Sequence, residues 1–240
     1  MEWTEDGIVL GARKHGESAA IVTMLTRDHG RHAGLVRGGA GRRARGVYQP
    51  GNRVLAHWSA RLSEHLGTFR CELLRAHAAD YLHDPLRLLA LSTATAIADA
   101  VMPEREPHPL VFDRLAGLMA RLGGDDWPAD YVRWEYMLLG ELGYGLDVGG
   151  TGAETGNGGA LFVSAYSGVA MAEGDGDPEP DGGERRLRLP AFLLSEDASP
   201  ATGELGAGLA LTGHFLNQRV FLPERRTLPA TRTRLVNGLQ

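Results

Sequence analysis

Apolar and polar positions alternate along most of the first eighty residues, in short runs separated by glycine-containing or polar turns. The runs lie at 7–13, 18–27, 32–38, 52–61 and 65–75, and they are rich in valine, leucine, isoleucine and aromatic residues. Turn sequences such as "KHGE" and "RDHG" stand between the first of them. Five short strands in so few residues predict a small barrel, because an open sheet would leave edges to protect.

The run 52–61 shows the alternation most clearly. One face is apolar and consists of Val54, Ala56, Trp58 and Ala60. The opposite face is mostly basic or polar and consists of Arg53, His57, Ser59 and Arg61. This pattern is typical of a strand with one face in a core and the other in solvent.

After Tyr81 the spacing of apolar residues changes to that of helices. Asp84 followed by Pro85 predicts a helix start, with a capping side chain and proline at the first helical position, and the apolar run 85–101 follows. Four more helices are predicted, at 109–122, 128–142, 207–221 and 229–239.

The stretch 149–185 is rich in glycine and acidic residues, and its middle, 160–172, predicts a hairpin. The segment 174–184, "GDGDPEPDGGE", has no apolar side chain, so we expect it to be a mobile surface excursion. The predicted fold is therefore α+β and multi-domain, with a five-stranded barrel over 1–80 and a helical domain over 81–240 that carries 149–185 as an insertion.

Composition limits the class of protein. No apolar run reaches the roughly 18 residues of a membrane span, and the acidic N-terminus does not resemble a signal peptide. Cys71 is the one cysteine, which excludes an intramolecular disulfide and a cysteine-cluster metal site. We therefore expect a cytoplasmic protein that does not bind membranes.

The net charge of −5 hides an asymmetry. Residues 1–80 hold twelve basic and eight acidic residues, whereas the remainder holds thirteen basic and twenty-two acidic ones. Charge segregated in this way favours a polyanionic partner for the first part of the chain, and a solvated basic face is an equally good interpretation.

Catalysis is not favoured by any motif. The glycine-rich segment "GGAGRRARG" has no lysine followed by serine or threonine and is expected to open no helix, so it does not match a phosphate-binding loop. Cys71 falls within a predicted strand, where a buried inert thiol is the commoner case. His29 and His32 lack carboxylate or cysteine partners at metal-ligand spacing. We expect no enzyme activity, no metal and no cofactor.

The same segment does favour nucleic-acid binding. Arginine forks onto phosphates and stacks on bases, and a barrel with a cationic groove and flat side chains suits a single strand. A flexible, solvated turn is the simpler alternative. The candidate DNA-binding residues are Arg13, Lys14, Arg31, Arg37, Arg42, Arg43, Arg45, Arg53 and Arg61.

Six stretches, in order along nearly the whole chain, resemble the RecO family of bacterial recombination mediators. They are "MEWTEDGIVLGARKHGES", "LVRGGAGRRARGVYQPGNRV", "RLSEHLGTF", "PEREPHPLVFDRL", "LLGELGYGLD" and "LTGHFLNQRV". The resemblance implies an oligonucleotide-binding (OB-fold) barrel followed by a helical domain, without enzymatic turnover. It also implies binding of single- and double-stranded DNA, annealing of complementary strands, and a location at the nucleoid.

The partners that this resemblance implies are RecR, the acidic C-terminal tail of single-strand-binding protein and, indirectly, RecA, which the family helps to load onto coated strands. Many relatives carry a four-cysteine zinc site after the stretch that matches "GYGLD". In this chain 149–185 contains no cysteine and no histidine, so that site cannot form.

The acidic tail requires a groove with apolar residues and arginine at one end. Helices 109–122 and 128–142 offer Arg114, Leu118, Arg121 and Arg133 for this purpose, although ordinary core leucines and surface arginines explain the same pattern. Two other functions stay open. One is a protein-interaction adaptor with little DNA binding of its own, and the other is an enzyme hidden by divergence.

Overall fold

The structure is a computed structural model that describes residues 1–148, 161–172, 185–195 and 198–239. The chain splits into two compact units by its internal contacts. The first unit is Met1–Gly123 with Pro229–Gly238, and the second is Gly124–Leu228 with the last residues of the chain. The boundary at residue 80 between a barrel domain and a helical domain stays a prediction.

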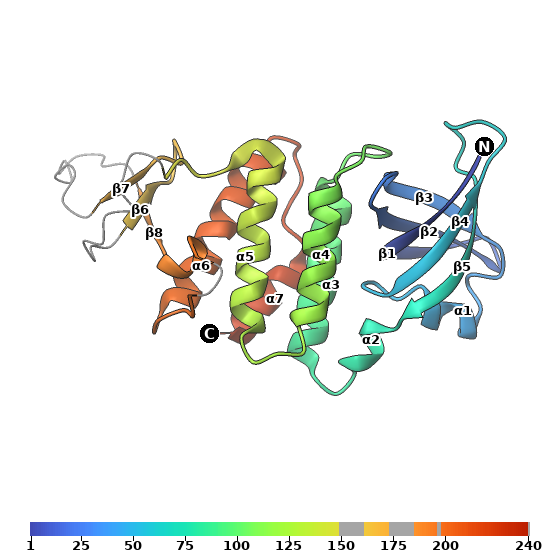
Figure 1. The fold of residues 1–240 in the computed structure, drawn as a ribbon, viewed down its shortest axis with the longest axis horizontal. Helices are drawn as coiled ribbons and strands as arrows, with labels where there is room; N and C mark the ends of the chain where they lie inside the picture. The colour runs from blue at the N-terminus through green and yellow to red at the C-terminus, as the bar shows by residue number, and fades with distance from the viewer. Residues whose placement is uncertain (149–160, 173–184, 196–197, 240) are drawn as a thin grey trace. The chain divides into compact units, whose positions relative to one another are not determined.

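The first unit begins with a five-stranded barrel in the order β1-β2-β3-β5-β4 (Figure 1). Its strands are β1 (Glu2–His15), β2 (Ala19–Thr26), β3 (Gly30–Val36), β4 (Arg53–Ser59) and β5 (Thr68–Arg75). β4 pairs back onto β1, and all neighbours are antiparallel except β3 and β5. That parallel joint has one registered pair, Leu35 with Thr68. The fold class predicted from sequence, an OB-fold barrel followed by helices, is confirmed.

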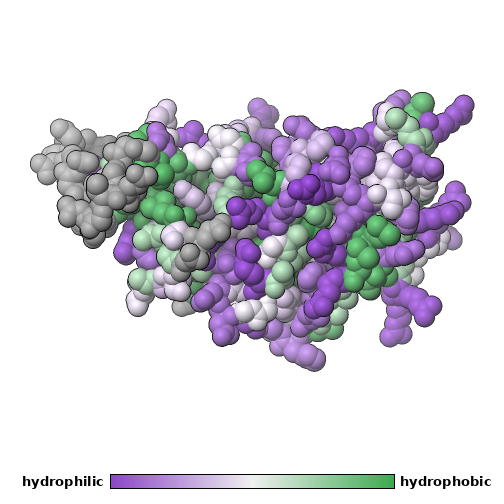
Figure 2. All heavy atoms as spheres, viewed as in Figure 1, coloured by the Kyte–Doolittle hydropathy of each residue, from purple (hydrophilic) through white to green (hydrophobic). Residues whose placement is uncertain are grey.

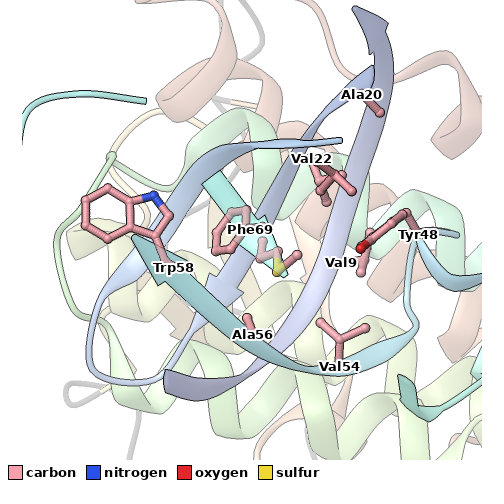
Figure 3. Packing of buried hydrophobic residues seen from close by; sticks show 10 residues of the cluster. Val9, Ala20, Val22, Tyr48, Val54, Ala56, Trp58 and Phe69 are labelled. Atoms are coloured by element: carbon pink, nitrogen blue, oxygen red, sulfur yellow. The ribbon is translucent and has the colours of Figure 1, made fainter. Parts of the chain in front are cut away.

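The barrel encloses an apolar core (Figure 3). The buried face of β4 is the one that the alternation predicts, because Val54, Ala56 and Trp58 are 0 to 3% exposed. Gly34 on β3 permits the close approach of Phe69, since a Cβ atom at position 34 would stand 2.4 Å from its ring. The rings of Trp58 and Phe69 thus fill the barrel interior, where removal of large side chains is costly.

The remaining elements of the first unit are helical. A short helix α1 (Arg42–Val47) joins β3 to β4, and α2 (His77–Asp80), α3 (Pro85–Val101), α4 (Pro109–Arg121) and α7 (Ala230–Leu239) follow. The predicted start of α3 is confirmed, because Asp84 accepts a hydrogen bond from the backbone N–H of Arg87 at 3.1 Å.

The connection between α3 and α4 packs against the barrel. Gly30 allows this approach, because a Cβ atom there would stand 2.0 Å from the backbone oxygen of Glu106. The backbone N–H of Arg105 donates to the carbonyl of Arg31 on β3 at 2.8 Å, and its guanidinium donates to the carbonyl of His65 in the β4–β5 loop at 2.8 Å. Arg105 adopts a left-handed backbone conformation, with φ of 61°, to make both contacts.

The second unit packs two helices and a small sheet. Its elements are α5 (Trp127–Leu139), η1 (Gly140–Tyr144), β6 (Leu161–Ser164), β7 (Ala170–Ala172), β8 (Arg186–Leu189), η2 (Ala191–Leu193), α6 (Glu204–Phe215) and η3 (Leu216–Phe221). Glu135 of α5 is buried and accepts hydrogen bonds from Tyr131 at 2.7 Å and from Thr212 of α6 at 2.6 Å.

The predicted hairpin within 160–172 is confirmed, since β6 and β7 pair antiparallel. The third strand, β8, was not expected from the sequence; it pairs with β6. The segment 174–184 lies outside the described residues. No helix in the described part of the chain is long and apolar enough to cross a membrane.

Candidate nucleic-acid interface

Six basic residues lie on neighbouring segments of the chain at the end of the barrel where β1 turns into β2. Lys14 pairs with Ala20, which in turn pairs with Val36, so the ends of three strands lie side by side. The segment after β3 is held to the same turn, because the backbone N–H of Ala40 donates to the carbonyl of Ser18 at 2.9 Å. We call this set the basic end, and it consists of Arg13, Lys14, Arg37, Arg42, Arg43 and Arg45.

The arginines Arg42, Arg43 and Arg45 lie in helix α1, which corrects the expectation of a flexible loop that opens no helix. Although α1 is short, it has one apolar face and one charged face. Ala44 and Val47 pack against the barrel core, while the three arginines are exposed. Figure 2 shows hydrophilic side chains extending outward where Figure 1 draws α1. Packing of one face therefore fixes the direction of the positive charges on the other.

Asn52 holds the C-terminal end of α1 in place. Its side-chain amide donates to the carbonyls of Gly46 at 2.9 Å and Val47 at 3.1 Å, and its side-chain oxygen accepts from the backbone N–H of Ala78 in α2 at 3.2 Å. Gln49 adds a hydrogen bond to the carbonyl of Arg45 at 3.0 Å. Since Asn52 is only 1% exposed, these bonds satisfy a buried amide and the open end of the helix together.

All six side chains of the basic end are exposed, and within the described part of the chain none has an ion-pair partner. Most other arginines of the barrel differ from them. Arg27, for example, makes two hydrogen bonds to Asp113, at 3.1 and 2.9 Å. Cations without carboxylate partners keep their full attraction for a polyanion.

Arg31 and Arg53 do not join the basic end. Arg31 donates to the carbonyl of Met102 at 2.7 Å and pairs with Asp99 at 3.3 Å and Glu104 at 3.4 Å, all in or after α3. Arg53 pairs with Asp6 and lies over the ring of Phe112, 5.8 Å from its centroid. Both guanidinium groups are engaged inside the protein, so we do not carry them forward as DNA contacts.

Arg61 lies apart from the basic end, in the loop after β4. It lines an open depression of about 720 Å³ together with Met1, Glu2 and His65. The pairing of Glu2 with Ser59 places this depression at the N-terminal end of β1, whereas the basic end lies at the C-terminal end of that strand. The sequence pattern groups Arg61 with the other arginines, and the fold separates it from them.

An aromatic cluster that the sequence analysis did not identify surrounds His32. Trp3 stacks on His29 with ring centroids 4.4 Å apart, and Trp58 meets His32 edge-on at 4.7 Å. Both ring nitrogens of His32 are buried without a hydrogen-bond partner in the structure. Burial lowers the pKa of His32 to about 4, and the charge of Arg105 adds to this effect, so the ring is neutral at neutral pH.

The residues predicted to hold an acidic tail belong to both units of the chain. Leu118 is fully buried in the first unit, which removes it from the accessible surface. Arg133, in the second unit, donates to the carbonyls of Phe192 at 3.1 Å and of Ala198, and it pairs with Asp130 at 3.6 Å. Arg114 and Arg121 are exposed on α4. We therefore limit the predicted site for the acidic tail to Arg114 and Arg121.

The described residues offer no group of three or more histidine, cysteine or acidic side chains that could hold a metal ion. The four-cysteine zinc site that the resemblance implies for many relatives does not fit this chain, whose one cysteine lies in β5. Burial raises the pKa of the Cys71 thiol to about 11, so the thiolate required of a ligand or nucleophile is disfavoured at neutral pH.

Comparisons with known proteins cover both parts of the chain. Residues 1–77 match the family model "Recombination protein O N terminal", and residues 82–228 match "Recombination protein O C terminal". The chain is 52% identical over 239 residues to the DNA repair protein RecO of Rhodospirillum centenum, which covers 99% of this chain and 94% of that protein. It is 44% identical over 247 residues to the DNA repair protein RecO of Rhodospirillum rubrum, covering 100% and 97% of the two chains. It is also 44% identical over 242 residues to the DNA repair protein RecO of Phenylobacterium zucineum, and the alignment covers 100% of this chain and 98% of that protein.

Proposed function

Because the chain belongs to the RecO family and so has a role in DNA repair and recombination, we propose that it binds single- and double-stranded DNA and anneals complementary strands. With RecR, it would help to load RecA onto strands coated by single-strand-binding protein. It acts as a mediator without enzymatic turnover, in the cytoplasm at the nucleoid.

One observation carries the DNA-binding proposal: the six cations of the basic end are exposed and have no ion-pair partner among the residues that the structure describes, and three of them lie on a helix that is packed on the barrel core. Cations held in place by a packed helix lose less conformational entropy on binding a strand than cations on a mobile loop do. Phosphate contacts of this kind supply most of the affinity of sequence-independent binding.

The test is the salt dependence of oligonucleotide binding. Each phosphate contact contributes ~0.7 to the slope of log affinity against log salt on single strands. Replacing Arg42, Arg43 and Arg45 by alanine should flatten this slope by up to about 2. The matched comparison is Arg42→Ala with Arg43→Ala against Arg27→Ala with Arg226→Ala, which also removes two exposed arginines, each paired with a carboxylate.

If the two double variants change the slope equally, net charge and not the basic end determines binding. If no variant changes it and the wild-type affinity is weak at low salt, the adaptor function replaces the DNA-binding one. Annealing of complementary oligonucleotides, with and without single-strand-binding protein, then tests the mediator role directly.

We also propose that the acidic tail of single-strand-binding protein contacts α4 through Arg114 and Arg121. Both side chains are exposed, and they are distinct from the arginines required for DNA, so the two ligands need not compete. Charge reversal in Arg121→Glu should weaken the binding of a tail peptide and spare a bare oligonucleotide. Loss of peptide binding in the alanine variant of Arg42, Arg43 and Arg45 instead would place the tail on the barrel.

A further inference from the structure

A pocket of about 420 Å³ in the first unit is used by none of the contacts proposed above. Its volume falls within the roughly 300–1,000 Å³ of small-molecule sites. It lies between the end of β5, helix α2 and helix α4. The residues that line it are Arg53, Leu74, Arg75, His77, Tyr81, Ala116, Met119 and Ala120.

The pocket has basic side chains, and yet their charge is compensated. Arg53 pairs with Asp6, and Arg75 pairs with Asp80 at 2.8 Å. Burial lowers the pKa of His77, and the charge of Arg75 lowers it further, so this ring is neutral at neutral pH. Among the described residues that line the pocket, a phosphate or a free carboxylate would find no unpaired cation, in contrast to the basic end.

The chemistry of the lining suits a flat, uncharged ligand with polar edges. His77 and Tyr81 are planar, and Leu74, Met119 and the two alanines are apolar. The guanidinium of Arg75 is paired with Asp80 and is still 63% exposed, so it presents a flat face, on which a base can stack, and N–H groups that can meet a carbonyl oxygen. A neutral imidazole offers one donor and one acceptor. A nucleobase has this combination of a stacking face and a hydrogen-bonding edge.

The pocket is next to α1. Asn52 hydrogen-bonds to Gly46 and Val47 of α1 and to Ala78 of α2, so one side chain spans the distance between the two helices. Arg53 follows Asn52 directly in the chain, and His77 precedes Ala78, and both line the pocket. A strand whose phosphates lie on α1 therefore has the pocket within reach of its bases.

We propose that this pocket receives one unstacked nucleobase of a strand whose phosphates contact the arginines of α1. The inference rests on the proposed DNA binding and adds a base-holding site to it. Phosphate contacts on α1 would position the strand, and the pocket would keep one base out of the stack and turned toward the protein.

The experiment is photo-cross-linking of a thymidine oligonucleotide that carries one 5-iodouracil. The variant Leu74→Glu places a charge at the pocket from a residue that is 53% exposed, and Leu82→Glu is the matched control, because Leu82 is 66% exposed, close in sequence and absent from the lining. Melting temperatures of both variants show that each is folded.

We expect adducts on His77 or Tyr81 in the wild-type protein and in Leu82→Glu. Leu74→Glu should lose most of these adducts and bind the oligonucleotide about tenfold more weakly, the size of one lost base–aromatic contact. Adducts confined to other residues, or equal affinities of the two variants, would overturn the inference while leaving the DNA-binding proposal intact. Binding without any adduct on His77 or Tyr81 would likewise overturn only the inference, and absence of binding would refute both proposals.

An acidic peptide ending in an apolar residue provides the last arm. If this peptide binds the wild-type protein, loses affinity in Leu74→Glu and displaces no adduct on His77 or Tyr81, the pocket is a peptide site and the inference is wrong. Unchanged peptide binding in Leu74→Glu, together with lost adducts, supports the base site.

Discussion

At the scale of single residues, His32 is the feature with the clearest thermodynamic consequence. The residue is 5% exposed, and neither ring nitrogen has a partner in the structure. A buried polar group without a hydrogen bond lowers stability, because it gives up its bonds to water without replacing them. The aromatic rings of Trp3, Trp58 and Phe69 around it would accept an apolar ring of similar size.

The first prediction concerns the pH dependence of folding. The pKa of His32 is about 4 in the folded chain and about 6.5 in the unfolded chain, so the unfolded state binds more protons between these values. The contribution of His32 to the free energy of unfolding is fully present above about pH 6.5, and it falls by up to ~3 kcal/mol as the pH drops toward 4. His32→Phe should flatten this part of a denaturant-melting profile, whereas His15→Gln, at an exposed histidine, should not. Equal profiles for wild type and His32→Phe would contradict the assignment.

At the scale of elements, α1 depends on residues that contact no ligand. The sequence indicates a loop at this point because Gly38, Gly39 and Gly41 precede the arginines, and glycines weigh against a helix. The structure uses these glycines differently. Gly38 has φ of 71°, and Gly39 lies so close to Ala20 that a Cβ atom would stand 2.9 Å from it. They bring the chain tightly over the end of β2, and the helix begins directly afterward.

The second prediction tests this support. Asn52→Ala removes three hydrogen bonds of a buried side chain and should lower the free energy of unfolding by about 1–3 kcal/mol. It should also weaken oligonucleotide binding while leaving the salt slope unchanged, since every arginine is still present. Gln49→Ala removes one exposed hydrogen bond to the same helix and should have a much smaller effect on both measurements. A flattened slope in Asn52→Ala would show that α1 itself has been lost.

At the scale of the whole molecule, the sequence predicts the secondary structure that local patterns determine. It does not predict the contacts between residues that are far apart in the chain. The strands of the barrel and the start of α3 at Asp84 follow from alternation and capping, which are readable within a few residues. The engagement of Arg31 could not be foreseen, because its partner Asp99 is 68 residues away in the chain. Leu118 likewise has the spacing of an amphipathic stripe, and only the packing of α4 shows that this stripe is core.

The third prediction concerns the acidic segment 174–184. Its five acidic residues are opposite in sign to the excess charge of residues 1–80, which include the barrel strands. Deleting it should leave oligonucleotide affinity and annealing intact, because it offers no apolar side chain for packing and no cation for phosphates. A large loss of melting temperature or of DNA affinity in the deletion variant would show that the segment has a structural or binding role.

The joint between β3 and β5 gives the barrel a preferred line of opening. Only one residue pair is in register there, and the backbone N–H of Leu35 donates to the carbonyl of Gly67 at 3.0 Å. Arg105 connects the two sides of this joint. Its backbone N–H donates to the carbonyl of Arg31 on β3, and its guanidinium donates to the carbonyl of His65 in the β4–β5 loop. The amide of Leu35 should therefore exchange its hydrogen by a local opening that Arg105→Ala accelerates, while amides on β1 and β2 keep their protection. The loop that leads into α4 therefore controls how often the barrel opens locally between β3 and β5.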